Sequence, residues 1–136
     1  MYLKAPVQAM YPGINIKIYN SASEISLPVD PKYFHAGQAL HGSVYFRLLD
    51  DAAYFAVSSI VEDVFVVTSS FHIDLLRPVH TGTLTAKGKV LHVSKNVFLA
   101  ESILTDNRGR KIALGKGSFM RSQLNFENVK GYEKRN

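Results

Sequence analysis

The 136-residue sequence contains no cysteine. It can therefore form no disulfide bond, no thiolate metal site and no cysteine nucleophile. It also has no uncharged apolar segment of about 18 residues, the length that a membrane-spanning helix needs. Its N-terminal segment lacks the unbroken apolar centre of a signal peptide. We therefore expect a cytoplasmic protein with no membrane partner.

The motifs of several enzyme classes are also missing. The sequence has no Gly-x-Ser-x-Gly nucleophile elbow, no Walker loop and no dinucleotide-binding fingerprint. Its histidines follow no metal-ligand spacing, so we expect no metal and no cofactor. Its basic segments carry no interleaved aromatic residues, which argues against a nucleic-acid partner. The distinctive part of the sequence is instead the segment from Phe34 to Ile60.

Lysine and arginine are concentrated in the second half of the chain. Residues 77–121 hold nine Lys/Arg and two Asp/Glu, whereas residues 1–76 hold four and seven. Such an excess favours an anionic partner, for example a phosphate group. Lysines on strands that simply face water would give the same count, and composition alone does not separate the two interpretations.

The segment from Phe34 to Ile60 predicts a glycine-containing turn followed by one long helix. Two apolar stripes run along it, which predicts a helix enclosed by the rest of the protein. Asp50 and Asp51 interrupt it, although a buried carboxylate is costly unless it is paired or used. Arg47 could pair with one of them on the helix surface. Because adjacent helical residues point about 100° apart, we expect the second carboxylate to face elsewhere.

The remaining pattern predicts strands. On residues 64–76 we expect Phe65, Val67, Ser69, Phe71, Ile73 and Leu75 on one face and Thr68, Ser70, His72 and Asp74 on the other. Gly115 and Gly117 indicate a bulge or a close approach of the backbone. The predicted fold class is α+β, one antiparallel sheet around one helix, in a single domain over residues 1–136 with its core at about 13–122 and a flexible polar C-terminal tail. The expected strands are residues 14–19, 24–29, 64–76, 83–93, 96–105 and 111–121.

Motifs within this order resemble those of hotdog-fold acyl-CoA thioesterases of the phenylacetate-degradation type. The pattern typical of that branch is similar to Asn-x-x-Gly-x-x-His-Gly-Gly, followed by Leu-x-Asp on the helix. Here the histidine is His41, the glycine is Gly42, and Asp50 follows the histidine by nine residues. The segment Phe71–Pro78 is also similar to this branch, and the resemblance covers roughly residues 13–122.

The resemblance implies a thioesterase acting on an acyl- or aryl-CoA, in a homodimer or homotetramer with the site between subunits. It implies that Asp50 is the catalytic carboxylate and that the backbone N–H of Gly42 is the oxyanion donor. The hydroxyl that positions water falls on Thr68, with Ser69 and Ser70 as neighbouring hydroxyls that could take the same role. Further candidates for the catalytic group are His35 and His41, although a histidine such as His41 more often caps or packs. Candidates for substrate binding are Ser43, Ser69 and Arg77.

The sequence departs from the family pattern at two positions. His35 stands where the family has asparagine, and unlike asparagine it can titrate near neutral pH. Ser43 stands where the family has a second glycine and adds a side chain close to the expected path of the thioester. The alternative to an enzyme is therefore a non-catalytic module that binds or senses either an acyl-CoA or an acyl-carrier protein.

Overall fold

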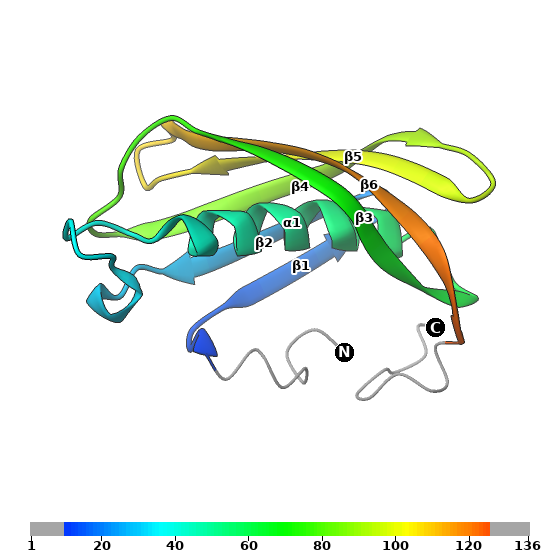
Figure 1. Cartoon of the computed structure of the whole chain (residues 1–136), viewed down its shortest axis with the longest axis horizontal. Coiled ribbons are helices and arrows are strands. Elements are labelled where there is room, and N and C mark those ends of the chain that lie inside the picture. The colour runs from blue at the N-terminus through cyan, green and yellow to red at the C-terminus, as the bar shows by residue number, and fades with distance from the viewer. Residues whose placement is uncertain (1–9, 126–136) are drawn as a thin grey trace.

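The computed structural model describes residues 10–125 and consists of one helix enclosed by one sheet (Figure 1). The sheet has six antiparallel strands in the order β1-β2-β4-β5-β6-β3, so β3 lies at an edge. Among residues 10–125 no helix is long and apolar enough to cross a membrane. The elements are β1 (Asn15–Tyr19), β2 (Ala22–Pro28), the short helix η3 (Pro31–Tyr33), α1 (Gly42–Ser58), β3 (Val64–Leu75), β4 (Thr83–Val93), β5 (Val97–Thr105) and β6 (Lys111–Asn125).

The sheet curls around α1, and the core lies between the two (Figure 1). Both predicted stripes of the helix are buried: Leu48, Leu49, Ala52 and Ala53 expose none of their surface. On β5, and on β4 as far as Val90, every second residue points inward, as alternation requires. The polar tail predicted after Ser122 falls largely outside the described residues, and residues 123–125 continue β6.

The middle of α1 is held directly against the sheet. The backbone of Ala52 lies so close to Gly88 on β4 that a Cβ at Gly88 would come within 2.2 Å of the Ala52 carbonyl oxygen. Two buried serine hydroxyls of the sheet donate to helix carbonyls, Ser23 to Ala52 at 2.5 Å and Ser102 to Leu49 at 2.7 Å. These contacts fix the helical turn that carries Asp50.

Strand β3 corrects one sequence prediction. Its pairing with β6 shifts between Thr68 and Ser70, which makes Ser69 the extra residue of a β-bulge. Before the bulge the inward and outward positions are therefore exchanged: Val66 is fully buried and Val67 is 41% exposed. The predicted faces are wrong for residues 65–69, because simple alternation does not include a bulge. Thr68 thus faces the helix rather than the opposite side of the sheet.

Gly115 and Gly117 on β6 make the close approach that the sequence indicated. A Cβ on Gly115 would lie 2.7 Å from the Phe71 ring, and one on Gly117 would lie 2.4 Å from it. The two glycines therefore form a slot that the aromatic ring of β3 fills. This contact brings the inner side chains of β3 close to those of α1.

Candidate active site

The N-cap residue of α1 is His41. The backbone N–H of Ser43 donates to His41 Nδ1 at 3.0 Å, and the Ser43 hydroxyl lies 2.8 Å from the same nitrogen. The N–H of His41 donates to Tyr33, and that of Val44 donates to the His41 carbonyl. The N–H of Gly42 has no acceptor among residues 10–125. His41 is therefore engaged as a cap, and Gly42 presents an unused donor at the positive end of the helix.

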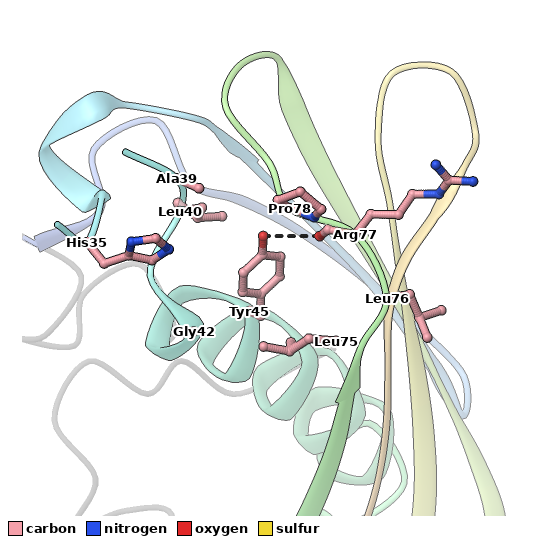
Figure 2. Close-up of a pocket in the computed structure, with 9 residues that line it drawn as sticks. All are labelled: His35, Ala39, Leu40, Gly42, Tyr45, Leu75, Leu76, Arg77 and Pro78. Carbon is pink, nitrogen blue, oxygen red and sulfur yellow. Dashed lines mark hydrogen bonds between the residues drawn. The ribbon is translucent and has the colours of Figure 1, made fainter. Parts of the chain in front are cut away.

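A pocket of about 330 Å³ lies beside this N–H (Figure 2). The His35 imidazole points toward it and accepts from the Gly37 N–H at 2.9 Å. The Tyr45 hydroxyl closes one wall by donating to the Arg77 carbonyl at 3.3 Å. The Arg77 guanidinium extends away from Gly42, so only its backbone faces the pocket (Figure 2). The lining residues are His35, Ala39, Leu40, Gly42, Tyr45, Leu75, Leu76, Arg77 and Pro78.

Asp50 and Thr68 meet where α1 passes β3. The Thr68 hydroxyl donates to Asp50 Oδ1 at 3.0 Å. Burial of the carboxyl raises the pKa of Asp50 to about 6; the Thr68 hydrogen bond and Arg47 oppose the rise, and Asp51 adds to it. The carboxyl group is thus half ionised near pH 6 and mostly ionised at neutral pH.

Asp51 behaves differently from its neighbour. Arg47 Nε donates to Asp51 Oδ2 at 2.5 Å across one helical turn. The Arg47 guanidinium also lies over the ring of Tyr11, 5.1 Å from its centroid. The two adjacent carboxylates therefore have different partners, as expected from their angular separation.

The other predicted site residues do not join the Asp50–Thr68 pair. Ser69 lies in the bulge and is exposed, and the hydroxyl of Ser70 lies 2.8 Å from that of Ser118 on β6. Ser43 contacts His41 at the other end of the site. Among the basic residues of the second half that the structure describes, several form ion pairs: Lys89 with Glu101, Arg110 with Asp106, and Arg121 with Asp63.

A seam of four contacts runs along α1 and β3. Gly42, Phe46, Asp50 and Tyr54 are spaced by four residues and so lie on one helix stripe. Sequence reasoning missed Phe46 and Tyr54, although this spacing from Asp50 could have revealed them. The contacts are Gly42 beside Leu75, Phe46 edge-on to Phe71 at 5.6 Å, Asp50 bound to Thr68, and the Tyr54 hydroxyl bound to the Val66 carbonyl at 2.5 Å.

Gly42 and Asp50 of one chain are too far apart to act on one carbonyl group. They are eight residues apart on the same helix, which corresponds to about 12 Å along its axis. A reacting carbon must lie within about 3.5 Å of its attacking group and close to the oxyanion donor. A single chain therefore presents the two halves of the candidate site separately.

The thioesterase superfamily model matches residues 37–113, which include both halves of the site. The PaaI protein from the phenylacetic acid degradation operon of E. coli is 27% identical, with a TM-score of 0.83 over 92% of this chain and 90% of that one. A mutant PaaI from Thermus thermophilus is 18% identical, with a TM-score of 0.77 over 86% and 99%. A protein of Saccharolobus solfataricus named as a candidate esterase is 25% identical over 78% of each chain. The chain belongs to the thioesterase superfamily, and its single helix within a curled sheet is the hotdog fold of the PaaI structures.

Proposed function

We propose that this protein hydrolyses the thioester bond of an acyl- or aryl-coenzyme A. The observation that carries the proposal is the half-buried Asp50, which accepts from Thr68 and whose pKa of about 6 leaves it ionised at neutral pH. A carboxylate with such a pKa is suited to accept a proton from water. The family membership and the relatives named as PaaI and as an esterase support a hydrolase.

In the proposed reaction, Asp50 takes a proton from a water molecule that Thr68 helps to orient, and the water oxygen attacks the thioester carbon. Direct attack by the carboxylate is the other course open to Asp50. The negative charge that develops on the carbonyl oxygen accepts a hydrogen bond from the Gly42 N–H and is stabilised by the helix terminus. The carbon–sulfur bond then breaks, and the proton held by Asp50 passes to the leaving thiolate.

The two halves of the site come from two copies of the chain in this proposal. The free edge of β3 supports such a pairing, since an edge strand offers unpaired backbone groups to a second strand. Exposed apolar side chains accompany this edge: Phe46 is 39% exposed, Val67 41% and Leu75 52%. A homodimer is the smallest assembly that completes the site, and a dimer of such dimers remains compatible with it.

The contacts along the seam favour one register for two paired β3 strands. Antiparallel pairing centred on His72 sets Ser70 opposite the partner's Asp74, with both side chains on the same face of the sheet. With Ser69 as a bulge, Leu75 then lies opposite the partner's Thr68. Because Gly42 adjoins Leu75 and Asp50 binds Thr68, this register brings each Gly42 to a partner's carboxylate.

The absence of cysteine makes this register testable. His72→Cys would set two thiols opposite each other across the symmetry axis, within the Cα separation of about 7 Å that a disulfide allows. We expect a covalent dimer after mild oxidation. Asp74→Cys is the matched control, because its two copies would be offset by four residues, or about 13 Å. Efficient crosslinking of the control, with none for His72→Cys, would refute the register.

The substrate we propose is a coenzyme A thioester rather than a short thioester, and the basic second half of the chain is consistent with its anionic nucleotide. Arg77 is one of the residues that line the pocket. The turn that carries Arg108 is joined to the loop that follows Arg77, because the Thr83 N–H donates to Asn107 Oδ1 at 2.7 Å. These two side chains are candidates for binding the nucleotide phosphates. An acyl-carrier protein carries the same pantetheine arm and would use the same pocket.

A panel of thioesters with a thiol-detecting reagent tests the function. We expect release of free coenzyme A from at least one acyl- or aryl-CoA, and slower turnover of pantetheine thioesters that lack the nucleotide. Tight binding of an acyl-CoA with no thiol release across the panel would favour the non-catalytic binding module. Neither binding nor turnover would contradict both functions.

A further inference from the structure

Tyr54 makes the second hydrogen bond between α1 and β3, one helical turn beyond Asp50. Its hydroxyl donates to the Val66 carbonyl at 2.5 Å. Its ring is fixed by three aromatic neighbours, with centroid distances of 4.9 Å to Phe55, 6.0 Å to Phe65 and 6.1 Å to Phe119. Tyr54 therefore joins a rigid helix to β3 two residues before Thr68.

Only a short part of β3 around Thr68 is paired regularly with β6, namely Val66–Thr68 with Arg121, Met120 and Phe119. The register shifts between Val64 and Val66 and again between Thr68 and Ser70. The three residues Val66–Thr68 thus lie between two irregularities of an edge strand. Bulges re-aim side chains, and the Tyr54 hydrogen bond from the helix contacts this short segment two residues before Thr68.

We infer that Tyr54 is a positioning residue for the catalytic pair: its hydrogen bond to Val66 holds β3 where the Thr68 hydroxyl reaches Asp50. This inference rests on the proposed function for its kinetic consequences, but its structural content does not depend on turnover. Truncation to phenylalanine removes one oxygen atom and keeps the ring that packs among Phe55, Phe65 and Phe119.

Tyr54 does not itself exchange protons in this account. Burial, with a further contribution from Asp51 and then Asp50, raises the pKa of its phenol, so it remains a hydrogen-bond donor throughout the working range of pH. The charged groups that influence the pKa of Asp50 are Asp51 and Arg47, both on α1. From β3, the Thr68 hydroxyl donates a hydrogen bond to it. A change at Tyr54 can therefore reach Asp50 through the placement of Thr68.

The first test is the titration of the Asp50 carboxyl group by carbon-13 NMR, with the signal assigned by Asp50→Asn. In Tyr54→Phe we expect the Asp50 midpoint to move upward, because the Thr68 hydrogen bond lowers the pKa of that carboxyl. Thr68→Val should move it in the same direction, and the double variant should add little to either change. Thr68→Ser, which keeps the hydroxyl, should restore the wild-type midpoint.

The kinetic test follows the same logic. In Tyr54→Phe we expect kcat to fall by roughly ten-fold with a nearly unchanged KM, because misplacement of a catalytic group affects the chemical step. The acid limb of the pH profile should move upward with the NMR midpoint. Tyr19→Phe, an exposed tyrosine of β1, is the control and should change neither.

A lower melting temperature of Tyr54→Phe with an unchanged Asp50 midpoint would show that Tyr54 only stabilises the fold, and would overturn the inference. Additive shifts in the double variant would overturn it as well, because Tyr54 would then act independently of Thr68. If the wild-type protein hydrolyses no thioester, the proposed function fails, and the NMR titration still decides the role of Tyr54.

Discussion

The two ends of the α1 stripe that runs from Gly42 to Tyr54 differ in how they are held, as the turns at Asp50 and at Gly42 show. The turn at Asp50 is anchored, with Ser23 and Ser102 bound to helix carbonyls and the Ala52 backbone against Gly88. The turn at Gly42 borders a pocket, and His41 and Ser43 beside it are exposed. One end offers a carboxylate whose charge is disfavoured by burial, and the other offers an unused N–H. The two ends are chemically complementary, yet a straight helix keeps them apart.

The largest effect on turnover is expected at the Asp50 end of the stripe, which is anchored to the sheet. Asp50→Asn keeps the shape and removes the base, so turnover should fall by about 10² to 10⁴. Asp51→Asn removes an ion pair with Arg47 that lies away from Thr68, and turnover should stay within a few-fold. Turnover of both variants on one good thioester distinguishes the two carboxylates. Loss of activity in Asp51→Asn with Asp50→Asn still active would contradict the assignment.

A slightly smaller effect on turnover is expected at the Gly42 end of the stripe. Gly42→Pro removes the N–H at the first position of the helix, where proline is well tolerated. His41, with φ −66° and ψ 142°, already has a conformation that suits a residue before proline. Turnover should fall by about 10² to 10³, as for the loss of one oxyanion donor. Gly42→Ala keeps the N–H, and its Cβ would meet Leu75 at an ordinary 3.8 Å, so this control should remain active.

The smallest effect concerns stability at the anchored end. The pKa of Asp50 is raised from 3.8 to about 6 in the folded protein. Between these values the unfolded chain releases a proton that the folded protein retains, so the contribution of Asp50 to stability is lost as pH rises through about 6. The ionised group then costs on the order of 2 to 3 kcal/mol. Asp50→Asn should therefore melt several degrees above wild type at pH 8.

The difference between the two melting temperatures should shrink toward pH 4, where Asp50 is protonated in both states. Calorimetry of both proteins at the two pH values provides the measurement. An equal difference at pH 4 and pH 8 would mean that Asp50 is not destabilised by its surroundings.

Sequence reasoning predicted the family, the α+β architecture and the central helix, and the comparisons and the fold confirm these. They follow from strong local signals: two apolar stripes, alternating strands and a histidine–glycine motif at a fixed distance from Asp50. The roles of Asp50, Gly42, His35 and the other site residues remain predictions.

The missed features depend on tertiary contacts. The bulge at Ser69 reverses the faces of the first part of β3, and a bulge leaves no mark in simple alternation. Phe71 packs into a slot made by two glycines on another strand. The sequence analysis did not single out Tyr54, and its hydrogen bond to a backbone carbonyl depends on where β3 passes the helix.

The central claim is that Gly42 of one chain works with Asp50 of another. Mixing Asp50→Asn and Gly42→Pro proteins after joint unfolding and refolding tests it most directly. Each heterodimer would contain one intact site, with Gly42 from the first variant and Asp50 from the second, and one site with both defects. We predict that the mixture recovers about a quarter of wild-type turnover when half of the dimers are mixed, although each variant alone is nearly inactive. No recovery, with mixed dimers demonstrated by differently tagged chains, would contradict a site shared between subunits.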